Sequence, residues 1–227
     1  MAGNNYPMVP GHEIVGTVTA VGPAVSLVAV GDRVGVGPQG GACMDGEACR
    51  ECGREANNFC PKRVFTYNSP IPNPPGVTYG GYAEAHITHE AFAIPIPDGM
   101  DSAVAAPLLC AGITTYSPLV HFGKGLKPGA RVGVVGIGGL GHMGVQYAAA
   151  LGYSVTAISR TPSKEAEAQT FGATSFLLSS DADAMAAAQG TFDFILCTVS
   201  ASLPWELFLG LCAPDGVFCM LGLPPSP

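Results

Sequence analysis

The chain has 227 residues, of which 48% are hydrophobic and 12% are charged, and its formal net charge is −7 at pH 7. This length suits one large domain or two small ones. The negative charge argues against a nucleic-acid-binding protein, because no basic stripe is available to neutralise phosphates. We find no stretch apolar enough to span a bilayer and no signal peptide. We therefore expect a cytoplasmic protein without a membrane segment, whose thiols stay reduced.

The first part of the chain, residues 1–110, is rich in glycine, proline and short β-type runs. Three of these runs, at 14–21, 32–38 and 83–88, predict strands of a barrel-like β domain. The segment 66–81 is rich in proline and glycine and is predicted to be a loop. Helical patterns are scarce in this part of the chain.

Four cysteines within the first part, Cys43, Cys49, Cys52 and Cys60, have the spacing C-x5-C-x2-C-x7-C. Four thiolates held close together by short loops suit tetrahedral zinc and leave no open coordination position, which is typical of a structural site. In a reducing compartment, clustered cysteines favour a metal over disulfides. The alternatives are two disulfides or four unrelated buried thiols.

The second part of the chain alternates strand and helix patterns. Strands of this kind joined by helices indicate a parallel sheet with right-handed crossovers. After a helical stretch at 102–120, the predicted strands are 130–138, 153–159, 175–180, 192–199 and 216–222, and the clearest helices are 140–152 and 163–172, each closed by a glycine.

A glycine loop follows the first of these strands. Gly136, Gly138 and Gly141 form the pattern G-x-G-x-x-G between a strand and a helix, which is the context that gives the pattern meaning. The first glycine allows the tight turn, the second lets the backbone approach a pyrophosphate, and the third lets helix and strand pack closely. Gly139, Leu140 and Thr198 complete the predicted loop contacts with a coenzyme. The alternative is a glycine-rich turn without a ligand.

The end of the second strand indicates which nicotinamide coenzyme fits. An NAD site has an Asp or Glu there for the ribose hydroxyls. This chain instead has Ser159, Arg160 and Lys164, and no acid stands before Glu165. A hydroxyl, a guanidinium and an ammonium suit the 2′-phosphate of NADP. The sequence therefore favours NADP, and the alternative is a solvated helix start.

Several motifs in the same order resemble one family. The run GHEIVG at 11–16, the run CAGITTYSPL at 110–119 and the run GIGGLGHMGVQYA at 136–148 are similar to zinc-containing medium-chain alcohol dehydrogenases, in the cinnamyl-alcohol-dehydrogenase branch with its fungal NADP-dependent members. The similarity extends from about residue 6 to residue 222. It implies an α/β architecture, in which a GroES-like catalytic domain (1–110) is followed by a Rossmann domain (111–227).

The resemblance also implies the chemistry, which is reversible hydride transfer between NADP(H) and a primary alcohol or aldehyde. His12 and Cys110 would be ligands of a catalytic zinc, Glu13 would lie beside the metal, and Thr114 would line the nicotinamide pocket. The zinc would act as a Lewis acid on the carbonyl oxygen. Without this context, His12 would be an ordinary polar residue and Cys110 a small core residue. His142 is predicted to be structural, and His86, His89 and His121 stay unassigned. Three cysteines are predicted to lie in the core: Cys197, Cys212 and Cys219.

The chain departs from the family pattern in three places. The family has a further cysteine ligand of the catalytic zinc upstream of GHE, and no cysteine precedes His12 here. The sequence ends at 223–227, after the fifth Rossmann strand, where the family continues through a sixth strand and dimer contacts. The cysteine cluster has five residues between its first two cysteines where the family usually has two, a difference that a loop can absorb.

We therefore expect an incomplete GroES-like domain, a Rossmann domain without its last strand, one complete structural zinc site and a partial catalytic site. The leading hypothesis is an NADP-dependent zinc alcohol dehydrogenase acting on a small alcohol or aldehyde. The family implies a homodimer, but the segment that carries the family's dimer contacts is missing here. The second hypothesis is a catalytically silent NADP- and zinc-binding remnant. A zinc-free quinone or enoyl reductase and a zinc-finger interaction module are less consistent with the cysteines, the GHE motif and the acidic charge.

Overall fold

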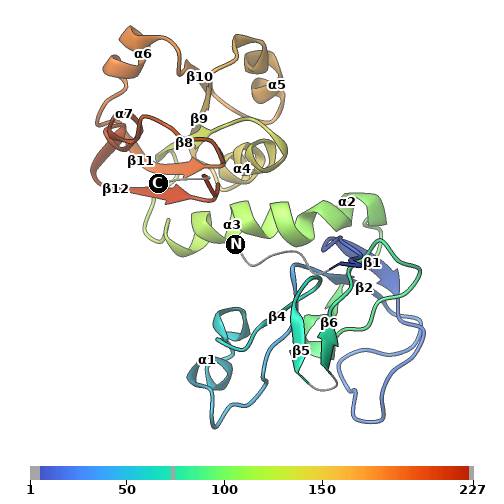
Figure 1. The fold of residues 1–227 in the computed structure, drawn as a ribbon. Coiled ribbons are helices and arrows are strands. Elements are labelled where there is room, and N and C mark those ends of the chain that lie inside the picture. The colour runs from blue at the N-terminus through green and yellow to red at the C-terminus, as the bar shows by residue number, and fades with distance from the viewer. Residues whose placement is uncertain (1–5, 73–74, 225–227) are drawn as a thin grey trace. The chain divides into compact units, whose positions relative to one another are not determined.

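The computed structural model describes residues 6–72 and 75–224. The chain divides into two compact units, Met1–Cys110 and Ala111–Pro227 (Figure 1). The helical segment that links them begins with α2 (Ser102–Pro107), continues as the π-helix η3 (Leu108–Gly112) and ends with α3 (Ile113–His121). Asp101 caps this segment, because its carboxylate accepts hydrogen bonds from the backbone N–H groups of Ala103 and Val104.

The first unit is built from short antiparallel strands. The strands β1 (Ile14–Thr17), β2 (Arg33–Val36) and β7 (Ile94–Pro95) form one sheet in the order β1-β2-β7. Two further pairs join β3 (Gln39–Gly41) to β4 (Val64–Phe65) and β5 (Pro70–Pro72) to β6 (Pro75–Val77). The helical turns of this unit are α1 (Arg50–Gly53), η1 (Asn57–Phe59) and η2 (Glu90–Phe92).

Two predictions for this unit are wrong in detail. Residues 83–88 form no strand, and Ile87 is 96% exposed, because no described strand forms a backbone ladder with this segment and β-type residues need a partner strand. The hydroxyl of Thr88 donates to the carbonyl of Gly40 in β3, but this is a side-chain contact. The predicted loop 66–81 instead contains the β5–β6 hairpin, with residues 73 and 74 outside the described ranges. Prolines are tolerated there because an isolated pair has free edges that need no ladder donor.

The second unit holds a five-stranded parallel sheet in the order β10-β9-β8-β11-β12. Its strands are β8 (Arg131–Val135), β9 (Ser154–Ser159), β10 (Ser175–Leu178), β11 (Phe192–Cys197) and β12 (Cys212–Met220). Its helices are α4 (Gly139–Ala150), η4 (Pro162–Lys164), α5 (Glu165–Thr170), α6 (Ala182–Ala187) and α7 (Trp205–Leu209). All five predicted strands are therefore present, and the predicted parallel sheet is confirmed.

The core of the second unit lies on both faces of this sheet. Along β11, Phe194 and Leu196 belong to one buried cluster, whereas Ile195 and Cys197 belong to the other. This alternation follows from the two-residue period of a strand. Both helices that were predicted to be closed by glycine end as expected, because Gly152 and Gly172 have positive φ angles of 83° and 105°.

One expectation about membranes needs correction. The helical segment Ser102–His121 has 20 residues and is, by length and composition alone, apolar enough to cross a bilayer. One such helix is weak evidence, because the core helix of a globular domain meets the same criterion. In the second unit Leu119 is fully buried within the core cluster, and Thr115 packs beside Gly144 of α4. We therefore interpret the α3 part of this segment as a helix that packs one face, with Thr115, Pro118 and Leu119, into the core of the second unit.

Candidate metal and coenzyme sites

The four cysteines of the first unit converge on one point. The Sγ atom of Cys43 lies 3.5 Å from that of Cys52 and 3.6 Å from that of Cys60, and the Sγ atoms of Cys49 and Cys60 are 3.9 Å apart. All four sulfurs lie within 4.8 Å of one another. Tetrahedral zinc with Zn–S bonds of about 2.3 Å places its sulfurs about 3.8 Å apart. The cluster therefore fits a zinc ion, and every cysteine is a free thiol rather than half of a disulfide.

The loop between the first two cysteines is held by its own polar groups. The carboxylate of Asp45 accepts hydrogen bonds from the backbone N–H groups of Glu47 and Ala48, and the carbonyl of Asp45 accepts one from Cys49. The backbone at Gly53 packs directly against the backbone of this loop. Only glycine fits at position 53, because a Cβ on Gly53 would lie 2.5 Å from the carbonyl oxygen of Gly46. The longer spacing therefore folds into an ordered turn and leaves the four thiols together.

The thiols of the cluster differ in acidity. Backbone N–H groups, first that of Cys43 and then that of Lys62, lower the pKa of Cys60 to about 7. Desolvation and the neighbouring thiols raise the pKa of Cys52 to about 12. A metal binds thiolates, so zinc binding to such a cluster releases protons and depends on pH.

The predicted catalytic ligands His12 and Cys110 lie together in the first unit. The Nε2 atom of His12 is 3.2 Å from the Sγ atom of Cys110, and its ring stacks on Tyr67 with centroids 5.7 Å apart. One nitrogen and one sulfur ligand of a tetrahedral zinc would be separated by about 3.5 Å. Glu13 is exposed, and the described residues group no third His, Cys, Asp or Glu side chain with this pair.

Glycines on two segments bring His12 and Cys110 to this position. A Cβ on Gly80 would lie 2.2 Å from the carbonyl oxygen of Gly11, and the N–H of Gly81 donates to the same oxygen. A Cβ on Gly37 would lie 2.7 Å from the carbonyl oxygen of Leu109, one residue before Cys110. The sequence analysis placed Gly37 in the predicted strand 32–38 and Gly80 in the predicted loop 66–81, without a packing role for either. Their pairing as G-x-G at 35–37 and G-G at 80–81 was the available signal for close backbone packing.

In the second unit, the carboxyl ends of three strands surround a cavity of about 370 Å³. Gly136 follows β8, Ser159 ends β9 and Thr198 follows β11. The strand order reverses between β8 and β11, and ligands of open α/β sheets bind at such a switch point. The cavity is lined by Gly136, Ile137, Gly138, Gly139, Leu140, Ser159, Thr161, Lys164, Thr198 and Val199.

The glycine loop has the geometry of a phosphate-binding turn. Gly136 has a φ of 86°, and a Cβ on Gly141 would lie 1.8 Å from the carbonyl oxygen of Gly136. A Cβ on Gly138 would meet no atom within 4 Å, so the backbone is open to the cavity there. No side chain caps α4, which leaves its first N–H groups for an anion.

Thr198 supports this loop from the neighbouring strand. Its hydroxyl lies 3.0 Å from the carbonyl oxygen of Val135 and 2.9 Å from that of Gly136, and its proton is donated to these oxygens. Its backbone N–H also donates to Val135. Thr198 therefore fixes the turn at Gly136 as well as lining the cavity.

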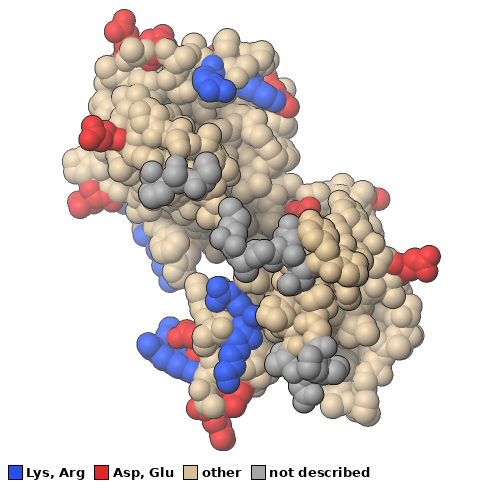
Figure 2. All heavy atoms as spheres, in the orientation of Figure 1, with Lys and Arg blue, Asp and Glu red and all other residues tan. Residues whose placement is uncertain are grey.

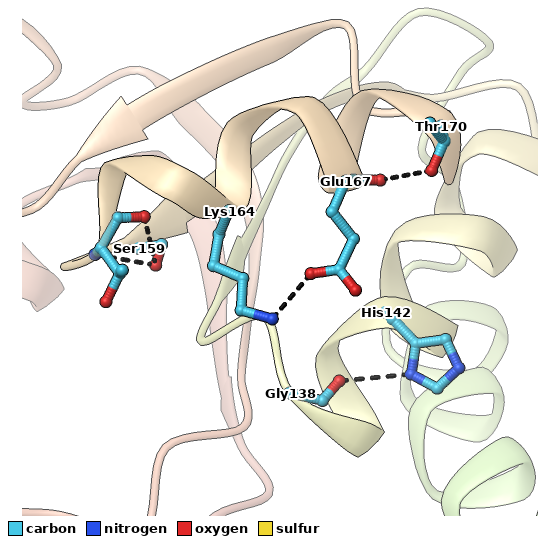
Figure 3. A network of polar contacts seen from close by, with 7 residues as sticks. Gly138, His142, Ser159, Lys164, Glu167 and Thr170 are labelled. Atoms are coloured by element: carbon cyan, nitrogen blue, oxygen red, sulfur yellow. Dashed lines mark hydrogen bonds and ion pairs between the residues drawn. The ribbon is translucent and has the colours of Figure 1, made fainter.

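Of the three residues predicted to bind the 2′-phosphate, only two line the cavity. Ser159 and Lys164 line it, whereas Arg160 is exposed, does not line it and makes no hydrogen bond or ion pair with the described residues. The Nζ atom of Lys164 lies 2.7 Å from the Oε2 atom of Glu167 (Figure 3). Gly141 and Thr114 do not line the cavity, and sequence reasoning missed Ile137, Thr161 and Val199. Thr161 carries a hydroxyl two residues past the strand end, which was the signal for it.

Three of the remaining histidines have local contacts. The Nδ1 atom of His142 is 3.2 Å from the carbonyl oxygen of Gly138, and its ring packs against Phe171. His89 caps η2 by accepting a hydrogen bond from the N–H of Ala91, and His121 packs edge-on against Phe122. These contacts are structural.

Known families match both units. Residues 1–98 match the family described as "Alcohol dehydrogenase GroES-like domain", and residues 139–227 match the family described as "Zinc-binding dehydrogenase". Among curated proteins, a "probable mannitol dehydrogenase" of Fragaria ananassa is 50% identical over 99% of this chain and 61% of its own length. A "probable cinnamyl alcohol dehydrogenase 3" of Oryza sativa is 47% identical over 98% of this chain and 60% of its own length.

Solved structures agree with these families. A cinnamyl alcohol dehydrogenase of Sorghum bicolor superposes with a TM-score of 0.92 at 42% identity, covering 98% of this chain and 63% of that one. The cinnamyl alcohol dehydrogenase of Helicobacter pylori, complexed with NADP(H), superposes with a TM-score of 0.89 at 37% identity, covering 98% of this chain and 62% of that one.

The fold and the two family matches thus place the chain in the class of zinc-type medium-chain dehydrogenases. The chain belongs to the zinc-containing medium-chain alcohol dehydrogenases, of the cinnamyl-alcohol-dehydrogenase type. It spans about 60% of the length of the curated relatives it matches. The family confirms the resemblance found in the sequence and excludes a zinc-finger module.

Proposed function

We propose that this chain carries the coenzyme and metal framework of an NADP-dependent zinc alcohol dehydrogenase, which transfers hydride reversibly between NADP(H) and a small primary alcohol or aldehyde. The observation that carries the proposal is the cavity at the switch point of the parallel sheet, lined by the glycine loop, Ser159 and Lys164. The four-cysteine cluster, which follows the GHE motif in the sequence of the first unit, supports the same class.

Each group has a distinct task in this proposal. The open backbone at Gly138 and the start of α4 would bind the pyrophosphate, and Thr198 would hold the loop in shape. Ser159, Thr161 and Lys164 would receive the 2′-phosphate, since hydroxyls and an ammonium donate to it and no carboxylate lines the cavity. Cys43, Cys49, Cys52 and Cys60 would hold a structural zinc.

The reaction itself needs a second metal. His12 and Cys110 have the chemistry and spacing of zinc ligands, with Glu13 next in the chain. A zinc bound there would supply Lewis-acid polarisation of the carbonyl oxygen. Because only two ligand side chains are grouped among the described residues, the second candidate is a silent remnant that binds NADP and one zinc.

Coenzyme binding and turnover test this function. The full chain should bind NADPH, followed by its fluorescence, at least about tenfold more tightly than NADH, and Lys164→Gln should remove most of that preference because it deletes the charge that faces the phosphate. Equal affinity for both coenzymes would contradict the NADP assignment. Oxidation of NADPH with small aliphatic and aromatic aldehydes distinguishes an enzyme from a silent remnant.

The family and the net charge suggest the localisation, the oligomeric state and the kind of partner. We propose a cytoplasmic protein that forms a homodimer and acts on small molecules rather than on nucleic acid or membranes. Figure 2 shows Lys and Arg atoms only in scattered groups on the face that it displays, mostly beside Asp or Glu atoms. Sedimentation of the purified chain checks the dimer.

A further inference from the structure

The rim of the coenzyme cavity carries an acid that the sequence pattern does not assign. Lys164, the only Lys or Arg that lines the cavity, is paired with Glu167 of α5 at 2.7 Å between Nζ and Oε2. Figure 3 shows the Lys164 side chain extending toward the loop at Gly138, with the Glu167 carboxylate next to its ammonium. The cation expected to meet a phosphate thus already has a carboxylate partner.

The pair is placed to exchange partners. Its side chains are 42% and 47% exposed, so neither charge is locked in the core. Glu167 also does not line the cavity itself, and the backbone carbonyl of Glu167 accepts a hydrogen bond from the hydroxyl of Thr170. An exposed ion pair of this kind is weak, so a bound phosphate can outcompete the carboxylate for the ammonium.

We propose that Glu167 is a positioning residue that sets the selectivity of this site for 2′-phosphorylated coenzymes by competing for Lys164. When a 2′-phosphate binds, the ammonium turns from the carboxylate to the phosphate, and loss of the ion pair lowers the affinity. A coenzyme without the 2′-phosphate leaves the pair intact. The inference rests on the proposed function, because it requires that Lys164 faces the adenosine ribose.

The same helix offers a matched control. Glu165 lies two residues earlier, is exposed, and its carboxylate makes no hydrogen bond or ion pair with the described residues. Residues two apart on a helix point in different directions, so Glu165 does not share the position of Glu167. Glu165→Gln removes the same charge from the same helix without touching Lys164.

Binding of two coenzyme fragments to the full chain tests the inference. Calorimetry would compare adenosine 2′,5′-bisphosphate with 5′-AMP for the wild type, Glu167→Gln, Glu165→Gln, Lys164→Gln and the double variant Lys164→Gln/Glu167→Gln, with thermal melting to verify folding. Glu167→Gln should tighten the bisphosphate about twofold to fivefold, as expected from the free energy of an exposed ion pair, and leave 5′-AMP unchanged. The gain should shrink at high salt and disappear in the Lys164→Gln background.

Each outcome decides the question. A selective gain in Glu167→Gln that is absent from Glu165→Gln supports the inference. An equal gain in both variants, a loss of affinity in Glu167→Gln, or a gain that persists without Lys164 overturns it. If the wild type does not prefer the bisphosphate, the NADP assignment and this inference both fail. If the wild type prefers it and Glu167→Gln has no effect, this inference alone fails.

Discussion

At the scale of single residues, the glycines of the coenzyme loop differ in what a side chain would meet at each position. A Cβ on Gly141 would collide with the backbone carbonyl of Gly136, whereas a Cβ on Gly138 would enter open space. Gly141 is therefore needed for folding, and Gly138 for the ligand. The motif predicted both positions and both roles, and the contacts of Gly141 and Gly138 agree with that prediction.

Two substitutions test this difference. Gly141→Ala should destabilise the chain by about 1–3 kcal/mol, because backbone must move to relieve the contact. Gly138→Ala should keep the wild-type melting temperature and weaken NADPH by about tenfold, because its methyl group occupies the place of the pyrophosphate. Melting curves and coenzyme fluorescence measure the two effects. A stable Gly141→Ala, or a Gly138→Ala that binds normally, would contradict the assignment.

Glu90 illustrates a residue whose role is structural and depends on pH. Its carboxylate accepts hydrogen bonds from the backbone N–H groups of Leu27 at 2.6 Å and Ser26 at 2.7 Å, and these lower its pKa. Because the pKa is lower in the folded state than in the unfolded state, this contribution to stability is present above the unfolded pKa of about 4.3 and is lost as the pH falls through the folded pKa.

Glu90→Gln should accordingly flatten the acid side of the stability profile. The free energy of unfolding of the variant should depend less on pH below about 4.3 than that of the wild type, as measured by denaturant titration. Glu84→Gln is the control, since Glu84 is exposed and has no such backbone donors. Identical acid profiles for Glu90→Gln and the wild type would refute the role of these hydrogen bonds.

At the scale of elements, the two units differ in how well their sequence predicts them. The strands of the second unit were predicted because β8 and β11 contain apolar runs, VGVV at 132–135 and FILC at 194–197, and because the helices after β8 and β9 end at glycine. In the first unit, the segment 83–88 has strand-like residues but pairs with no described strand. Pairing between distant segments cannot be read from local pattern, and so this prediction failed.

The same limit applies to the candidate sites. The cysteine spacing and the glycine loop lie within short segments, so sequence reasoning found them. The approach of Gly37 to the carbonyl of Leu109 joins segments about 70 residues apart, and the placement of Cys110 depends on it. Arg160 was predicted from its position after β9, but its side chain stays outside the cavity because it points to solvent.

Gly37, which directly follows β2, therefore yields a prediction at the scale of elements. Gly37→Ala should push the backbone at Leu109 and disturb the His12–Cys110 pair, so that any zinc held there is lost while the four-cysteine zinc remains. Gly16→Ala on β1 is the control, because a Cβ there meets no atom within 4 Å. Metal analysis of both variants checks this, and equal zinc contents would count against it.

At the scale of the whole molecule, the chain combines two units with separate tasks. The first holds the four-cysteine cluster and the His12–Cys110 pair, and the second holds the coenzyme cavity. Family membership unites them as parts of one zinc alcohol dehydrogenase framework, although the chain spans only about 60% of the length of its curated relatives. What differs between an enzyme and a silent remnant is whether the second metal is bound.

Zinc stoichiometry of the purified full chain, measured by atomic emission together with NADPH binding, tests this framework most directly. The wild type should contain two zinc ions per chain and bind NADPH. Cys52→Ser should lose one ion because it breaks the four-thiolate set, and His12→Asn should lose the other. The control Cys212→Ser should keep both, because that thiol lies outside the cluster. A wild-type chain with NADPH bound but one zinc ion or none, or an unchanged zinc content in Cys52→Ser, would contradict the proposed framework.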